Sequence, residues 1–73
     1  MNQAYKGTPF DLTDRVVLIS GATGLLGKEF ALAVASAGAH LVLGDLKRDS
    51  LESLKREIAS VYPHTKTWVQ VLD

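Results

Sequence analysis

Two kinds of hydrophobic pattern alternate along the chain. Short unbroken apolar runs, rich in branched side chains, occur at residues 16–19 and 41–43, and each run stops at glycine and polar residues. Runs of this length and composition are typical of strands buried on both faces of a sheet. Residues 67–72 are predicted to form a third strand, because Trp68 and Val69 suit a pleated surface.

The segment after the first strand has a helical pattern over residues 25–37. Its apolar residues fall at spacings of four, four and three, which places them on one helix face: Leu26, Phe30, Val34 and Ala37. We therefore expect this face to be buried. Gly38 follows at the position where a left-handed residue commonly ends a helix.

A second helix is predicted after the second strand. Asp49 is a candidate N-cap, and Glu52, three residues later, completes the spacing of a capping box. The buried face is expected to consist of Leu51, Leu54, Ile58 and Val61. Tyr62 and Pro63 should end the helix, because proline disfavours helical geometry in the residue before it.

The resulting order is strand, helix, strand, helix, strand. Alternation of this kind predicts an α/β fold, with parallel strands joined by right-handed crossovers in a doubly wound sheet of order 3-2-1. Both helices should cover the same face, which leaves the other face bare. We expect residues 1–11 to form a flexible N-terminal tail, and residues 12–73 to form the N-terminal portion of a larger domain.

Composition narrows the functional classes. The 73 residues carry 8 basic and 8 acidic side chains, so electrostatic binding to nucleic acid or to an anionic membrane has no support. The absence of cysteine excludes disulfides, thiolate metal sites and cysteine nucleophiles. No apolar stretch approaches the ~20 residues of a membrane-spanning helix, and the first residues lack the core of a signal peptide. We therefore expect a cytoplasmic protein.

The candidate chemistry lies in the sequence Ser-Gly-Ala-Thr-Gly-Leu-Leu-Gly at residues 20–27. This run follows the first strand directly and opens the first helix. A helix N-terminus offers free backbone N–H groups and the positive end of the helix dipole, which suit a phosphate. Glycines there permit a tight turn and close approach of a pyrophosphate. The alternative is an ordinary glycine-rich turn.

Asp45 comes at the end of the second predicted strand, 24 residues after Gly21. A carboxylate at this place can accept hydrogen bonds from the hydroxyls of an adenosine ribose, and it repels the 2′-phosphate of NADP. The pair of features therefore predicts a dinucleotide site that prefers NAD. Two alternatives remain: Asp45 is a solvated strand-end residue or a cap, and Lys47 with Arg48 contacts a 2′-phosphate rather than solvent.

These motifs resemble those of the short-chain dehydrogenases/reductases, and the likeness extends from Phe10 to Asp73. The resemblance implies a Rossmann-type three-layer sheet, of which only the β-α-β-α-β part is present, and hydride transfer with NAD or NADP on carbonyls and alcohols. It also implies that Asp45 and Leu46 contact the ribose and adenine, and that Asp73 contacts the adenine amino group. The matching pyrophosphate loop consists of Gly21, Thr23, Gly24, Leu25, Leu26 and Gly27.

The glycine spacing G-x-x-G-x-x-G resembles the family branch that modifies nucleotide sugars, whereas the Phe-Asp-Leu-Thr entry at residues 10–13 resembles the main branch. The leading interpretation is an NAD-dependent oxidoreductase acting on a carbonyl or alcohol, with a sugar-derived substrate as one option. The alternatives are a nucleotide-sugar epimerase or dehydratase, and a non-catalytic NAD(P)-binding regulatory protein. The expected partners are the cofactor, a small substrate bound by segments absent here, and further copies of the parent enzyme.

Three other motifs are set aside. Tyr62 and Lys66 have the family's catalytic Tyr-x-x-x-Lys spacing, but Pro63 makes a shared helix face improbable, so we expect no catalytic residue in this chain. An NTPase phosphate loop needs four residues between its glycines and a Ser or Thr after its lysine, whereas Glu29 follows Lys28 here. His40 and His64 have no partner at ligand spacing and are expected to be structural, and no metal site is predicted.

Overall fold

A computed structural model describes residues 11–72, in which strands and helices alternate. The elements are β1 (Val16–Ser20), α1 (Leu25–Ser36), β2 (His40–Asp45), α2 (Arg48–Val61) and β3 (Thr67–Val71). The strands are parallel, with β2 between β1 and β3. The predicted α/β class and the strand order are thus confirmed. Most of the proposed tail, residues 1–10, and Asp73 lie outside the described residues.

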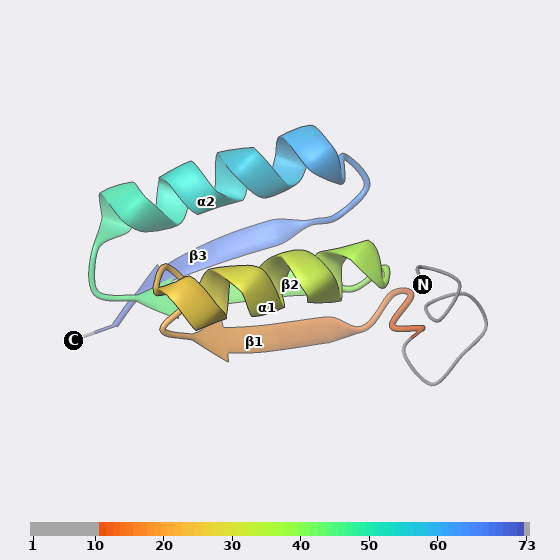
Figure 1. Ribbon diagram of the computed structural model, residues 1–73, viewed down its shortest axis with the longest axis horizontal. Coiled ribbons are helices and arrows are strands. Elements are labelled where there is room, and N and C mark those ends of the chain that lie inside the picture. The colour runs from red at the N-terminus through yellow and green to blue at the C-terminus, as the bar shows by residue number, and fades with distance from the viewer. Residues whose placement is uncertain (1–10, 73) are drawn as a thin grey trace.

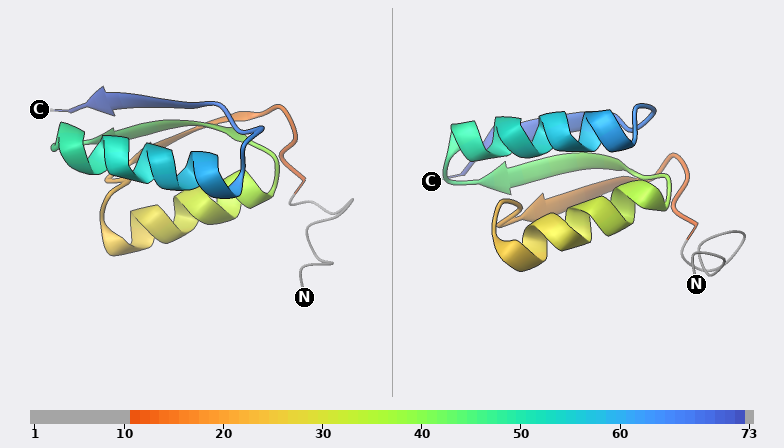
Figure 2. Two further views of the ribbon diagram at one scale, coloured as in Figure 1. Left: turned by 90° about the horizontal axis from the view of Figure 1, so that it is seen from above. Right: turned by 45° about the horizontal axis from the view of Figure 1, so that its top comes forward.

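Both helices lie on one face of the sheet, as expected for two crossovers of the same hand (Figures 1 and 2). The core forms between this face and the helices, and among the strands the central one contributes most to it. Leu41 and Leu43 of β2 are fully buried, as are Leu51 and Ile58 of α2. Neither helix of the described residues is long and apolar enough to cross a membrane.

The predicted buried face of α1 is wrong in part. Leu26 and Phe30 are 83% and 55% exposed, whereas Ala31, Val34 and Ala35 are buried. The reason is steric, because α1 packs closely on the sheet through its small side chains and turns the larger ones outward. Hydrophobic spacing identified the helix, but residue size decides which face approaches the sheet.

Two details of α2 also differ from expectation. The helix begins at Arg48, with Lys47 as N-cap and no capping side chain, so Asp49 lies in the first turn instead of capping it. Glu52 pairs with Arg48 at 3.7 Å rather than completing a capping box. Val61 is exposed; it is the last residue of α2, at the turn that leads back to β3.

The second face of the sheet carries a row of apolar side chains. Leu18, Val42 and Trp68 are in register across the three strands and therefore point to the same face. Figure 2 shows no helix of the described chain on that side. Leu18 is 72% exposed and Trp68 is also exposed. Within residues 11–72, the outer edge of β1 is also unpaired.

We expect the isolated chain to self-associate through this face, because an apolar patch beside an open strand edge favours pairing between copies. Leu18→Lys should shift the distribution in sedimentation velocity toward monomer. Leu46→Lys is the matched control, because Leu46 is 68% exposed but lies beyond the end of β2. A wild-type chain that is monomeric and unfolds in one sharp urea transition would contradict this prediction.

Candidate functional site

The glycine loop joins β1 to α1 at the carboxyl end of the sheet (Figure 1). Gly21 has φ +68°, a left-handed conformation that glycine adopts without cost. The Gly24 N–H donates to the Gly21 carbonyl at 3.1 Å, which closes the turn. A Cβ on Gly27 would overlap that same carbonyl oxygen. The loop geometry therefore requires glycine at Gly21 and Gly27.

The loop presents free amides at the start of α1. The first helical hydrogen bond is donated by Lys28 to the Gly24 carbonyl at 2.9 Å. Within residues 11–72, the N–H groups of Leu25, Leu26 and Gly27 have no backbone acceptor, and the first turn holds no acidic residue. These amides and the positive end of the helix dipole suit an anionic ligand.

Asp45, at the end of β2, is hydrogen-bonded to this loop. Its Oδ2 accepts hydrogen bonds from the Thr23 N–H at 2.8 Å and from the Thr23 hydroxyl at 2.6 Å. Its Oδ1 accepts from the Leu46 N–H at 2.7 Å. The Thr23 hydroxyl, followed by the amides of Leu46 and Thr23, lowers the pKa of the Asp45 carboxyl below its ordinary value. Asp45 is thus more than a solvated strand end.

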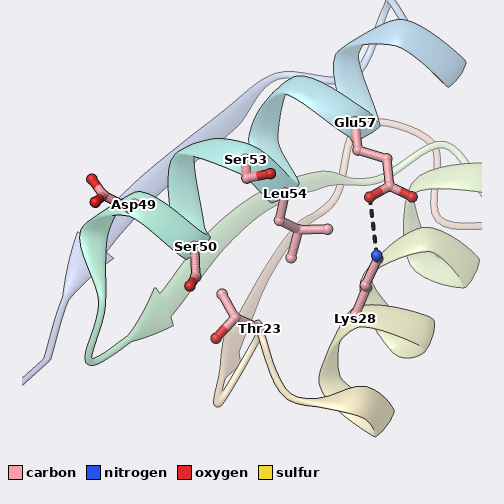
Figure 3. Close-up of a pocket in the computed structure, with 7 residues that line it drawn as sticks. All are labelled: Thr23, Lys28, Asp49, Ser50, Ser53, Leu54 and Glu57. Carbon is pink, nitrogen blue, oxygen red and sulfur yellow. Dashed lines mark ion pairs between the residues drawn. The ribbon is translucent and has the colours of Figure 1, made fainter.

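A cleft of about 310 Å³ adjoins the loop, between the start of α1 and the first half of α2 (Figure 3). Thr23 lines it together with Ser50 and Ser53, and an ion pair of 3.2 Å joins Lys28 to Glu57 across it. This cleft could not be predicted from the sequence, because residues on two separate helices carry no local signal of their contact.

The residues predicted for the site are only partly brought together. Leu46 adjoins Asp45 and is exposed, whereas Asp73 lies outside the described residues. Arg48 pairs with Glu52, and Lys47 stands at the N-cap position of α2 without a capping hydrogen bond from its side chain. Among the described residues there is no cluster of three or more metal-ligating side chains.

Tyr62 and Lys66 do not share a helix face. Tyr62 follows the last residue of α2 in a non-helical conformation, and Lys66 precedes β3. Lys66 donates its backbone N–H to His40 Nδ1 at 3.0 Å, at the amino end of the strands and thus opposite to the glycine loop. This contact agrees with the expected structural role of His40.

Comparisons with known proteins place these features among oxidoreductases. No protein-family model matches the chain. Its sequence is 41% identical over 56 residues to a very-long-chain 3-oxoacyl-CoA reductase of Aspergillus terreus, covering 77% of the chain and 16% of that protein. It is 38% identical over 61 residues to levodione reductase of Leifsonia aquatica, covering 84% of the chain and 23% of the relative.

Solved structures give the same picture. The structure of levodione reductase matches 85% of the chain with a TM-score of 0.80 and 37% identity, and the match covers 24% of that structure. A protein of Escherichia coli CFT073 assigned to the short-chain dehydrogenases matches 88% of the chain with a TM-score of 0.80 and 28% identity, over 28% of its own length. A second structure of such a protein from that strain holds NADPH.

The homologues and structural neighbours are thus short-chain dehydrogenases/reductases. The chain spans only about a sixth to a quarter of the length of these two curated relatives. The comparisons give no support to the nucleotide-sugar branch that the glycine spacing suggested.

Gly27→Ala should lower the free energy of unfolding by about 1–3 kcal/mol, because the added methyl group must displace the Gly21 carbonyl. Gly24→Ala is the control, since its Cβ would meet that oxygen at an ordinary 3.5 Å. Urea unfolding measures both variants. Helix propensity alone would stabilise Gly27→Ala by roughly 0.5–1 kcal/mol, and such a gain would contradict the close packing inferred here.

The lowered pKa of Asp45 predicts a pH dependence of stability. A carboxyl whose folded pKa is depressed stabilises the fold above its unfolded pKa of about 3.9, and this contribution is lost as pH falls through the folded pKa. Asp45→Asn should therefore flatten the fall of the urea midpoint below about pH 4. Glu29→Gln, at an exposed site on α1, should leave the wild-type profile, including the part due to Asp11 and its bonds from Thr13. An unchanged slope in Asp45→Asn would contradict the role of these hydrogen bonds.

Proposed function

We propose that the chain is the cofactor-binding N-terminal portion of a short-chain dehydrogenase/reductase and holds the adenosine and pyrophosphate half of NAD. The observation that carries this proposal is the meeting of the free loop amides with Asp45 through Thr23, at the carboxyl end of parallel strands. Ligands of open α/β sheets bind at this end. The names of the similar proteins support an oxidoreductase acting on a carbonyl or alcohol.

The residues present fit such a cofactor. The pyrophosphate would lie against the amides of Leu25, Leu26 and Gly27, where the missing Cβ of Gly27 lets the turn close on the helix. Asp45 would accept from the adenosine ribose, and exposed Leu46 would contact the adenine. When bound, the cofactor supplies the hydride chemistry. The catalytic groups and most of the substrate site would come from the longer protein.

We further propose that NAD is preferred over NADP. A 2′-phosphate would approach the Asp45 carboxylate, and like charges at such contacts are costly. Arg48 is already paired with Glu52, which reduces its capacity to offset that repulsion. The Escherichia coli neighbour holds NADPH, so this fold does not by itself exclude a 2′-phosphate, and the proposed preference for NAD rests on Asp45 of this chain.

Isothermal titration of the chain with NAD, NADP and ADP-ribose tests the proposal. If only the adenosine and pyrophosphate half is held, ADP-ribose should bind as tightly as NAD. NADP should bind about tenfold more weakly or worse, because of the charge on its 2′-phosphate. Binding of nicotinamide mononucleotide in preference to ADP-ribose would contradict the proposal.

Two matched variants test whether Asp45 causes the preference for NAD over NADP. Asp45→Ser should narrow the difference between NAD and NADP, whereas Asp49→Asn changes an exposed acid at the same end of the sheet and should not. Equal affinities for NAD and NADP in the wild-type chain would overturn the assignment of Asp45. In the longer protein, tight NADH binding without hydride transfer to any carbonyl would favour the non-catalytic regulatory alternative.

A further inference from the structure

Hydrogen-bond donors of the chain itself occupy most of the acceptor sites of Asp45, the carboxylate that is assigned to the ribose. A carboxylate offers about four lone-pair sites for hydrogen bonds, two on each oxygen. Oδ2 of Asp45 already accepts two, from the amide and the hydroxyl of Thr23, and Oδ1 accepts one, from the Leu46 amide. One site therefore remains open in the ligand-free chain.

An adenosine ribose brings two neighbouring hydroxyls as donors. If both are to bind Asp45, one of the three donors of the chain must leave. The two amides are held by the backbone, because Ala22 donates to the Gly44 carbonyl on one side of Thr23 and Leu72 donates to the Asp45 carbonyl. The Thr23 hydroxyl is the donor that can move, since it needs only a rotation of its own side chain.

We propose that the Thr23 hydroxyl is a placeholder that fixes the Asp45 carboxylate in the ligand-free chain and yields its place on Oδ2 to a ribose hydroxyl. Thr23 is then a positioning residue, which acts on the ligand through Asp45. The proposal rests on the proposed function, because it takes the ribose of a nucleotide as the incoming group. It goes further by naming the residue that sets how strongly the chain distinguishes ribose from deoxyribose.

The surroundings of Thr23 allow this exchange. Its side chain lines the open cleft together with Ser50 and Ser53, and water in this cleft can accept the released hydrogen bond (Figure 3). The bond to be replaced is short, at 2.6 Å. The same bond is the first cause of the lowered pKa of Asp45, as expected for a donor that stabilises the charged carboxylate.

The exchange has a specific consequence for binding. A ligand that lacks the 2′-hydroxyl makes one hydrogen bond fewer to Asp45, but the bond from the Thr23 hydroxyl to Asp45 then stays in place. A ligand with both hydroxyls gains one bond while the chain gives one up. Thr23 should therefore reduce the preference of the wild-type chain for ribose, and its removal should increase that preference.

The test compares ADP with 2′-deoxy-ADP by isothermal titration in four forms of the chain. The measured ratio is the dissociation constant of 2′-deoxy-ADP divided by that of ADP. Thr23→Val should raise this ratio roughly tenfold, the size expected for one hydrogen bond to a charged group. Thr23→Ser retains the hydroxyl and should keep the wild-type ratio. Ser50→Ala removes another hydroxyl of the same cleft and should also keep it. A general loosening of the loop would weaken both ligands equally, so an unchanged or lower ratio in Thr23→Val overturns the proposal.

A ligand-free measurement separates this proposal from the proposed function. Carboxyl ¹³C titration should show the Asp45 midpoint higher in Thr23→Val than in wild type, and unchanged in Ser50→Ala. An unmoved midpoint overturns the placeholder role, whatever the chain binds. Failure of wild type to bind ADP overturns the proposed function and the exchange with it. If Thr23→Val does not fold, Thr23→Ala replaces it, because it removes the same hydroxyl without adding a branched side chain.

Discussion

The hydrogen bonds between Asp45 and Thr23 fix the one relation on which the site depends, namely the position of the glycine loop relative to the end of β2. A third hydrogen bond, from the Ala22 amide to the Gly44 carbonyl, joins the same two segments. Parallel pairing of β1 with β2 brings their carboxyl ends side by side, and these bonds then aim the start of α1 at the acid. The free amides at the start of α1 and the Asp45 carboxylate thereby lie at the same edge of the sheet.

The fold could be predicted from sequence because its determinants are local. Short runs of branched apolar residues form β1 and β2, and glycine follows or ends each run. Their alternation with helical patterns predicts parallel strands joined by helices. The face of α1 could not be predicted in the same way. Phe30 fits the hydrophobic period, yet the contact with the sheet goes to Ala31 and Ala35. How closely a helix approaches its sheet depends on the size of both surfaces, and periodicity does not encode that distance.

The candidate site also has a part that could be predicted from the sequence and a part that could not. The glycine spacing and Asp45 could be found because each stands at the end of a recognisable strand. The contact of Asp45 with the Thr23 hydroxyl joins residues that lie 22 positions apart, and a threonine in a glycine-rich loop carries no sign of its partner. The Lys28–Glu57 pair was hidden for the same reason, because each residue suits the solvent-facing side of its own helix. Such contacts join different elements, and they can be identified only from the packed structure.

The central claim is that this end of the sheet binds the adenosine and pyrophosphate half of a dinucleotide. The most direct test is to map amide chemical shifts of the chain during titration with ADP-ribose. Binding at this end should give saturable shifts concentrated at residues 21–27 and at Asp45 and Leu46, with little change at the amino ends of the strands. Shifts that cluster instead around His40 and residues 61–65, or an absence of saturable shifts at the glycine loop, would contradict it.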